Sequence, residues 1–287
     1  MEAQSGAPVE ATIEQKLGNL QESLRALRRV IVAFSAGVDS TFLLKVALDT
    51  LGPDQVLAVT ARSDSLAAAE YDEALRLAEQ LRAPLRVLET EEFKDPTFLA
   101  NPANRCYYCK TELFTRLQRI AIDEGYNAIL AGTNADDLSD FRPGIQAGKE
   151  NNIVSPCADA GLTKNDIRVL SERMGLPTHD KPASPCLASR IPYGEAITPE
   201  KLRMIERGEA FLRSLGLREC RVRHHGNLAR IEIPTDRIAE CAEPTIRAKI
   251  DAEFRAIGYA YVTMDLRGFR SGSMNEVIAF GKKQPHP

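Results

Sequence analysis

A loop of hydroxyl, carboxylate and small side chains lies near the start of the chain, at residues 35–40. It follows a short apolar run and precedes an amphipathic one, so the order strand, tight turn and helix is predicted. Unpaired N–H groups and the helix dipole favour an anion at such a helix N-terminus. We therefore expect a phosphate or pyrophosphate site, with an ordinary strand–turn–helix corner as the alternative. Its candidate residues are Ser35, Gly37, Val38, Asp39 and Ser40.

Cysteine provides the second set of reactive side chains. Cys106 and Cys109 form a CxxC pair, which can be half of a zinc site, a redox pair or part of an iron–sulfur site. No second pair completes a four-thiolate zinc site, so Cys186, in a loop rich in Pro and Gly, is the natural third thiolate. Three thiolates would leave one iron of a four-iron cluster open, and three unligated thiols are the alternative. The remaining cysteines lack partner spacing and are expected to be structural: Cys157, Cys220 and Cys241.

A basic cluster is the third feature with chemical potential. Arg221 and Arg223 are two residues apart on a predicted strand, so their side chains share one face. Such a fork suits an anionic substrate, above all a phosphate, and Arg190 is expected near the same site. Glu209, on a predicted helix, is a candidate for metal or substrate contact. A solvated strand face is the alternative for the arginine pair.

These residues need elements to position them, and strands alternate with helices along the first two thirds of the chain. Buried strands are predicted at residues 30–35, 55–60, 85–89 and 127–132, and helices at 13–29, 67–82 and 163–175. The alternation predicts an α/β fold with a parallel sheet and right-handed crossovers. Ligands bind such sheets beyond the carboxyl ends of the strands. Three polar strand ends fit that expectation: residues 35–40, 60–63 and 132–137.

The last third has a different pattern and predicts a smaller α+β unit. A helix is expected at residues 199–215, a hairpin at 219–233, a helical stretch at 235–257 that Pro244 breaks, and a strand at 259–266. Proline and glycine in residues 180–194 prevent a long helix or central strand there, so we place the boundary in this stretch. The expected organisation is a disordered tail at 1–12, an α/β domain at 13–190 and an α+β domain at 191–287.

Length and composition bound the function. The 287 residues suffice for two domains, and 44% hydrophobic and 27% charged residues are typical of a soluble globular protein. A net charge of −3 gives no general attraction to nucleic acid. No apolar run of membrane-spanning length occurs, and the N-terminus lacks the pattern of a secretory signal. We expect a cytoplasmic protein with neither a membrane nor a nucleic acid as partner.

The motifs together resemble those of a known family. Residues 35–40 resemble the SGGxDS loop of the PP-loop ATP pyrophosphatases, although Ala36 stands where that family usually has Gly. Over about residues 13–280 the chain resembles the LarE family of such enzymes. The stretches that carry this likeness are NRCYYCK at 104–110, AGTNADD at 131–137, AGLTK at 160–164 and KPASPCLASRIPYG at 181–194. The family inserts sulfur into pyridinium-3,5-biscarboxylic acid mononucleotide, giving the bisthiocarboxylate that holds nickel in the pincer cofactor of lactate racemase.

The resemblance implies a PP-loop ATPase domain, a smaller C-terminal domain and defined residue roles. ATP with Mg²⁺ would adenylate a substrate carboxylate, with AMP as the leaving group. The pyrophosphate would be held by Ser35, Gly37, Val38, Asp39 and Ser40, and the nucleotide lined by Arg62, Gly132, Thr133 and Asp137. The phosphate of the substrate or neighbouring groups would be bound by Arg190, Glu209, Arg221 and Arg223. The catalytic residues would be Asp39 and Cys186.

The source of sulfur differs within the LarE family. Some members give up the sulfur of the cysteine equivalent to Cys186 and are left with dehydroalanine. Others carry three cysteines and are thought to use a [4Fe-4S] cluster with an extra sulfide. With Cys106, Cys109 and Cys186 the chain resembles the cluster type, which implies a sulfide source as partner. We also expect a homo-oligomer.

Three other functions remain as alternatives. A PP-loop tRNA thiolase would share ATP use, but the pI near 5.9 and the lack of a basic appended domain disfavour it. An amide-forming enzyme such as an NAD or GMP synthetase would leave the three cysteines without a role. A non-catalytic zinc scaffold would bind zinc and leave ATP intact.

Overall fold

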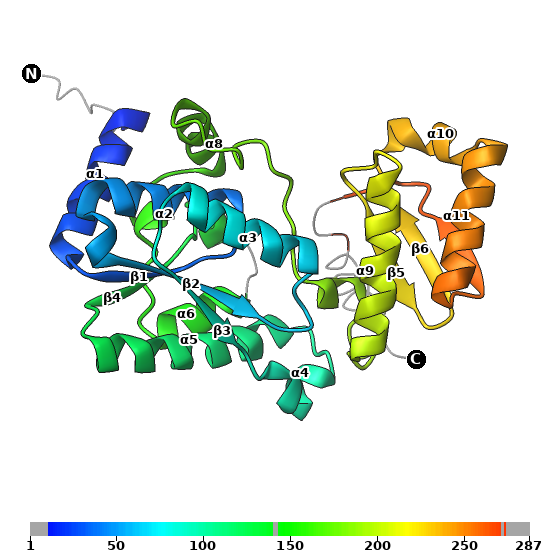
Figure 1. Ribbon diagram of the computed structural model, residues 1–287, viewed down its shortest axis with the longest axis horizontal. Helices are drawn as coiled ribbons and strands as arrows, with labels where there is room; N and C mark the ends of the chain where they lie inside the picture. Colours follow the sequence, from blue (N-terminus) through cyan, green and yellow to red (C-terminus); the bar gives the residue numbers. More distant parts are fainter. Residues whose placement is uncertain (1–10, 140–142, 271–272, 274–287) are drawn as a thin grey trace, which may run out of the picture. The chain divides into compact units, whose positions relative to one another are not determined.

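The computed structural model describes residues 11–139, 143–270 and 273 (Figure 1). The chain divides into two compact units. The first comprises the described residues up to 62 together with 68–90 and 109–183, and the second comprises 63–67, 91–108 and the described residues from 184 on. The division near the Cys186 loop thus falls after residue 183, whereas we expected it after 190. The association of residues 63–67 and 91–108 with the C-terminal part was not predicted.

A four-stranded parallel sheet forms the centre of the first unit, in the order β3-β2-β1-β4. Its strands are β1 (Val30–Ala33), β2 (Val56–Arg62), β3 (Leu85–Glu89) and β4 (Ala128–Ala131). In the register, Ile31 of β1 lies opposite Leu57 of β2 and Ile129 of β4. The strand β1 is therefore internal, and its unbroken apolar sequence is what a strand covered on both faces requires. The predicted α/β fold with a parallel sheet is confirmed.

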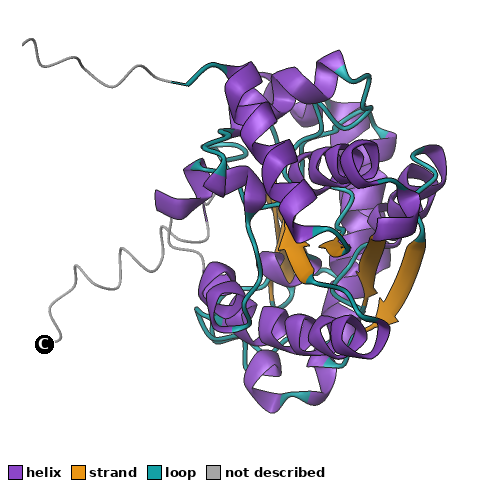
Figure 2. Cartoon of the chain, turned by 90° about the vertical axis from the view of Figure 1, so that its left-hand side faces the viewer, coloured by secondary structure: helices purple, strands orange, loops and turns teal. Residues whose placement is uncertain are grey.

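Helices cover both faces of this sheet (Figures 1 and 2). On one face lie α1 (Ile13–Leu27), α2 (Val38–Leu51) and α3 (Ala68–Gln80), and on the other α5 (Arg105–Glu124) and α6 (Pro143–Glu150). Two further α-helices of this unit are α7 (Pro156–Asp159) and α8 (Lys164–Arg173). The crossovers α2 and α3 follow successive strands and share a face, as right-handed connections demand.

The core of the first unit joins α1, α2 and the sheet. Leu20 and Leu24 of α1, Val32 of β1 and Phe42 of α2 are all fully buried. Burial of each such side chain contributes on the order of 1.5–3 kcal/mol. The position of α1 is also fixed locally, because Thr12 caps the helix in a capping box. The loop after β1 is thus attached to a rigid support.

The second unit holds a three-stranded mixed sheet in the order β5-β6-β7. The strands β5 (Arg221–His225) and β6 (Leu228–Glu232) form the predicted antiparallel hairpin, and β7 (Tyr261–Met264) pairs with β6 in parallel. The helices are α4 (Pro96–Leu99), α9 (Pro199–Ser214), α10 (Ile238–Ala242) and α11 (Pro244–Ile257). Pro244 occupies the first turn of α11 and so separates two helices, since proline is tolerated at a helix start.

One long helix was not expected. The helix α5 begins at Arg105, and the CxxC pair lies within its first two turns. Its buried apolar side chains are Leu113, Phe114, Leu117 and Ala121, which follow the helical spacing of three and four residues. The first residues of α5 belong to the second unit and those from Cys109 on to the first.

Candidate active site

The loop between β1 and α2 is curled around Ser40. The Ser40 hydroxyl lies 3.1 Å from the Ser35 hydroxyl and donates to the Gly37 carbonyl at 3.3 Å. The same Ser40 hydroxyl oxygen accepts a hydrogen bond from the Ser35 N–H at 3.2 Å. Gly37 is the N-cap of α2 and no side chain caps this helix. Ala36 adopts φ 55°, a left-handed conformation that favours glycine. The first N–H groups of α2 have no side-chain cap and are therefore available to bind an anion at the loop.

The carboxylate of Asp39 is held between two elements. Its Oδ1 accepts from the Asn134 amide at 3.3 Å, and its Oδ2 pairs with the Lys164 ammonium at 2.5 Å. Lys164 is the first residue of α8, whose capping box is made by Thr163 and Asp166. Asn134 falls within the stretch 132–137 that we expected at the site, whereas Lys164 had no predicted role. The capping pattern at 163–166 was the available signal, because it places Lys164 at a helix N-terminus.

Gly132, at the end of β4, lies against the backbone of α2. A Cβ atom there would lie 2.8 Å from the Ser40 nitrogen and 3.0 Å from both the Asp39 carbonyl carbon and the Ser40 Cα. Real Cβ atoms do not approach backbone so closely, so only glycine fits without movement. The predicted nucleotide-lining residue Gly132 thus brings the end of β4 to the loop at residues 35–40.

The remaining predicted nucleotide-lining residues differ in position. Asp137 is nearly buried and its carboxylate accepts from the Asn134 N–H at 3.1 Å, so it shapes the turn that follows Thr133. Arg62 is exposed, pairs with Glu89 at 3.4 Å and stacks over the ring of Tyr71. These contacts join Arg62 to β3 and α3, and neither involves the loop at residues 35–40.

In the second unit, Arg190 is the largest fully buried side chain and lies four residues after Cys186. Its Nε and Nη2 donate to the two oxygens of Glu209 at 2.8 and 3.0 Å. Its Nη1 donates to the carbonyls of Pro185 and Cys186 and to the Ser189 hydroxyl. All three guanidinium nitrogens therefore have acceptors, and the side chain fixes the backbone that carries Cys186.

Glu209 is equally occupied. Besides Arg190, its carboxylate accepts from the Val222 N–H at 3.1 Å and lies 3.5 Å from Arg213. Burial alone would favour the neutral acid, but the charge and hydrogen bonds of Arg190 hold the pKa of Glu209 below its usual value. We predicted both Arg190 and Glu209 as substrate-binding residues. The structure pairs them with each other, which favours a role in positioning the Cys186 loop.

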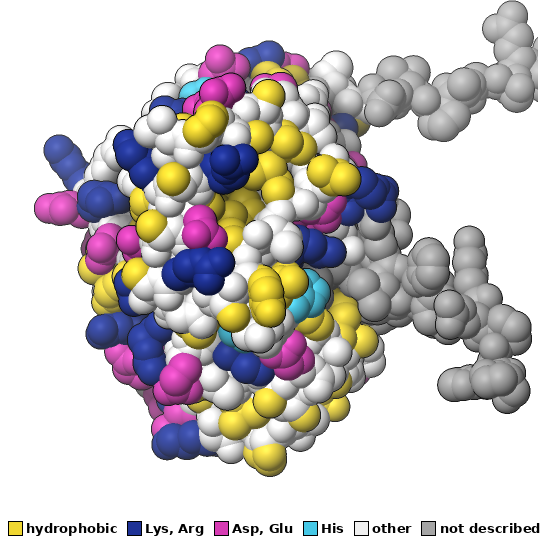
Figure 3. Space-filling view, turned by 90° about the vertical axis from the view of Figure 1, so that its right-hand side faces the viewer, with side chains coloured by type: hydrophobic (Ala, Val, Ile, Leu, Met, Phe, Trp, Pro, Cys, Tyr) yellow, Lys and Arg dark blue, Asp and Glu magenta, His cyan; other side chains and the backbone are white. Residues whose placement is uncertain are grey.

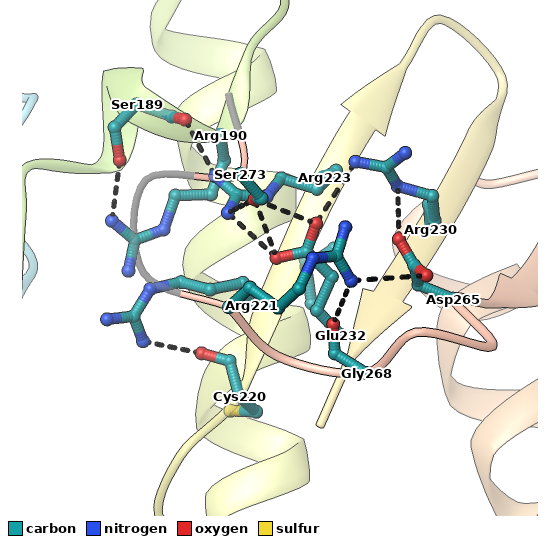
Figure 4. A network of polar contacts seen from close by, with 12 residues as sticks. Ser189, Arg190, Cys220, Arg221, Arg223, Arg230, Glu232, Asp265, Gly268 and Ser273 are labelled. Atoms are coloured by element: carbon teal, nitrogen blue, oxygen red, sulfur yellow. Dashed lines mark hydrogen bonds and ion pairs between the residues drawn. The ribbon is translucent and has the colours of Figure 1, made fainter. Parts of the chain in front are cut away.

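The other two predicted substrate-binding residues lie close by on β5 (Figure 4). Arg223 donates to Glu232 at 2.7 Å, to Ser273 at 2.8 Å and to the Ser189 carbonyl at 2.9 Å. Arg221 donates to the Cys220 carbonyl at 2.6 Å and lies over the ring of Phe269. Burial and the neighbouring positive charge of Arg190 lower the pKa of Arg221 to about 10, so it remains protonated at neutral pH. Both arginines are buried, and neither lies on a solvated strand face.

The three predicted metal-binding cysteines are accessible to different degrees. Cys106 is exposed, and Cys109 and Cys186 are half-buried. Burial raises the pKa of the Tyr193 hydroxyl. The positive charge of Arg105 opposes this rise, and Cys106 and Cys186 add to it by smaller amounts. In the part of the chain that the structure describes, no three His, Cys, Asp or Glu side chains are arranged to hold a metal ion.

The remaining cysteines are buried: Cys157, Cys220 and Cys241. Burial raises the pKa of the Cys157 and Cys241 thiols, and raises that of Cys220 to about 12. Such thiols stay protonated at neutral pH, and a protonated thiol is a poor nucleophile and metal ligand. Their environment supports the structural role that we expected.

The face shown in Figure 3 carries acidic and basic side chains interspersed, without a broad region of one sign. Binding to a nucleic acid backbone needs a basic patch or stripe. This face offers none. No helix among the described residues is long and apolar enough to cross a membrane.

Comparison with known proteins identifies one matching family model and several relatives that align with most of the chain. Residues 10–119 match the family model of NAD synthase. An uncharacterised protein of Synechocystis is 45% identical over 266 residues, which are 93% of this chain and 99% of that protein. The pyridinium-3,5-bisthiocarboxylic acid mononucleotide synthase of Lactiplantibacillus plantarum is 39% identical over 268 residues, 93% of this chain and 96% of the synthase. An uncharacterised protein of Methanocaldococcus jannaschii is 30% identical over 253 residues, 88% of this chain and 95% of that protein.

Proposed function

The chain belongs to the LarE family of PP-loop ATP pyrophosphatases, and we propose that it is an ATP-dependent sulfur transferase of nickel-pincer cofactor biosynthesis. Its substrate would be pyridinium-3,5-biscarboxylic acid mononucleotide, whose carboxylates it would convert to thiocarboxylates. The observation that carries this proposal is the uncapped start of α2 with Asp39 beside it, preceded by a parallel strand. The 39% identity to the bisthiocarboxylic acid mononucleotide synthase supports the choice of substrate.

Adenylation is the first chemical step. A substrate carboxylate oxygen attacks the α-phosphorus of ATP, the bond to the β-phosphate oxygen breaks, and pyrophosphate leaves. The N–H groups at the start of α2 and the hydroxyls of Ser35 and Ser40 would hold the pyrophosphate. Mg²⁺ is usually held by one or two carboxylates together with substrate phosphates, and Asp39 provides one carboxylate. Lys164, which pairs with Asp39 in this structure, would place a positive charge beside the same phosphates.

The phosphate of the mononucleotide would bind to Arg221 and Arg223. The buried Nε of Arg223 has no hydrogen-bond partner among the described residues, so this side chain retains a donor for an anion. Replacement of either arginine by alanine should raise the KM for the substrate by roughly 10- to 150-fold, the equivalent of about 1.5–3 kcal/mol for a charge-assisted bond. Unchanged KM values in both variants would contradict this assignment.

For the sulfur step we propose that Cys106, Cys109 and Cys186 hold one [4Fe-4S] cluster. The donor set fits the group, because three thiolates on two segments suffice for three of its irons and the fourth iron would bind an external sulfide. Cys106 is exposed and Cys109 and Cys186 are half-buried, so each thiol is accessible to a ligand, although the three are not arranged as a three-ligand group. Sacrifice of the Cys186 sulfur is the competing mechanism.

Two experiments test these steps. ATP labelled on its α-phosphate and incubated with protein and substrate should yield AMP and, in equal amount, pyrophosphate; ADP as the main product would contradict the assignment.

For the sulfur source, the protein is purified anaerobically and analysed for iron, sulfide and intact mass. The cluster predicts that Cys106→Ala and Cys109→Ala lose both iron and activity, with Cys241→Ala as the control. Retained activity in those variants, together with dehydroalanine at position 186 in the iron-loaded protein, would establish sacrifice instead. A sulfide source and a homo-oligomer remain predictions for the same preparation.

A further inference from the structure

Lys181 makes an unusual set of contacts with the loop at residues 35–40. Its side chain is only 12% exposed, and its ammonium group lies 2.7 Å from the carboxylates of both Glu70 and Glu73. The same nitrogen donates to the carbonyl oxygen of Ala36 at 3.1 Å. An ammonium group has three N–H donors, so these three acceptors satisfy it completely. One of them belongs to the backbone of the expected pyrophosphate loop.

The carbonyl that Lys181 binds belongs to the most strained residue of that loop. Ala36 has φ 55°, a conformation that glycine adopts readily and alanine does not. A peptide unit is planar and trans, so its C=O and the following N–H point in opposite directions. By holding the Ala36 carbonyl, Lys181 therefore also fixes the direction of the Gly37 N–H, which points away from the ammonium group.

The lysine is itself held from two sides. Glu70 and Glu73 lie three residues apart on α3 and so share one face of that helix. Arg168 of α8 donates to the backbone carbonyls of His179 and Lys181, at 2.6 and 2.9 Å. Both the side chain and the backbone of Lys181 are thus attached to helices of the first unit.

We propose that Lys181 is a positioning residue for the pyrophosphate loop, holding Ala36 in its left-handed conformation so that the Gly37 N–H is available to a bound phosphate. This proposal rests on the proposed function, because it assumes that the loop binds ATP. It also accounts for alanine at a position where glycine would need no such support. The competing explanation is that Lys181 only balances the charge of α3.

The test compares Lys181→Met with Lys16→Met. Lys16 is a matched control, because it is 13% exposed and forms an ion pair with Asp166 in the same unit without contacting the loop. The readouts are the KM and kcat for AMP formation, the Kd of pyrophosphate by calorimetry, and Tm. We expect Lys181→Met to raise the KM for ATP and the Kd for pyrophosphate by about 5- to 30-fold, the range for loss of one modest interaction. Lys16→Met should leave both constants unchanged while lowering Tm similarly.

The double variant Ala36→Gly, Lys181→Met tests the cause. Glycine adopts a positive φ without support, so Lys181→Met should weaken binding by a smaller factor in this background than in the natural one. Equal factors, or no change in pyrophosphate affinity in Lys181→Met, would overturn the proposal. If Lys181→Met does not fold, Lys181→Arg retains the charge but not the point-like ammonium, and should also weaken pyrophosphate binding. If the unsubstituted protein forms ADP, or binds neither ATP nor pyrophosphate, the proposed function itself is wrong. Failure of the Lys181 proposal alone would leave AMP formation by the unsubstituted protein intact, so the two failures can be distinguished.

Discussion

The Arg190–Glu209 pair allows a direct test of whether these residues bind substrate or support the Cys186 loop. Both side chains are 2% exposed, and two hydrogen bonds join them. Glu209→Gln keeps the shape of the side chain but removes the charge that neutralises Arg190. One of its two polar atoms would also become an N–H donor facing another donor. The perturbation is therefore electrostatic and leaves the packing nearly unchanged.

The magnitude follows from burial. Removing one partner of a buried ion pair leaves an uncompensated charge and costs about 3–5 kcal/mol. We expect Glu209→Gln at the lower end, because the amide oxygen can still accept from the Val222 N–H. Arg190→Met should cost a similar amount, since it also removes the donor to the carbonyls of Pro185 and Cys186. An exposed pair such as Arg203–Glu200 should change stability by less than about 1 kcal/mol and provides the control.

The assay measures urea unfolding together with the two chemical steps. Replacing a buried ion pair by apolar residues of similar volume is often neutral for stability, so the double variant Arg190→Met, Glu209→Leu should regain much of the loss. It still lacks the donor that fixes the Cys186 backbone. We therefore expect it to form AMP normally and to transfer sulfur poorly. Single variants as stable as the natural protein, with a raised KM for the nucleotide substrate, would refute this reasoning and favour direct substrate contact.

Three further predictions concern the first unit and His224, one of the two histidines of β5. Gly132→Ala should lower stability by about 1–3 kcal/mol and raise the KM for ATP, because its Cβ would meet backbone that cannot move without displacing the loop; urea unfolding and AMP formation measure both. Asp39→Asn should strongly slow AMP formation, and Lys164→Ala should raise the KM for ATP, each with a small effect on Tm since both side chains are partly exposed. Burial lowers the pKa of His224 from its ordinary value of 6.5, so the unfolded chain binds more protons and stability should fall as pH decreases below 6.5; His224→Gln should flatten this dependence in urea unfolding between pH 7.5 and 5.5.

Most of the fold could be predicted because the deciding signals are local. The apolar strands with polar ends indicated the parallel sheet, and strand β3 was placed at its observed bounds, Leu85–Glu89. The helix α5 was not predicted, although Phe114, Leu117 and Ala121 follow the helical spacing of three and four residues. Association of residues 91–108 with the C-terminal part could not be predicted. It depends on long-range contacts such as the Asn101 side chain donating to the carbonyls of Ile191 and Pro192.

Residue type and spacing identify candidate site residues, whereas the partner of each side chain could not be predicted. Period two places Arg221 and Arg223 on one face of a strand, but nothing in the sequence says that Glu232 lies beneath Arg223 or that Glu209 meets Arg190. Pairing of this kind depends on which strands and helices become neighbours in the fold, because the two partners lie on different elements of the chain.

Hydrogen-bond capacity then distinguishes the arginines of the second unit. Every guanidinium nitrogen of Arg190 donates at least one hydrogen bond to an acceptor within the fold, so none of its three nitrogens is without a partner. Two nitrogens of Arg223 donate to acceptors within the fold, whereas its buried Nε lacks a partner among the described residues. A buried donor without a partner costs free energy that a bound anion would restore. The substrate phosphate should therefore bind at Arg223 rather than at Arg190.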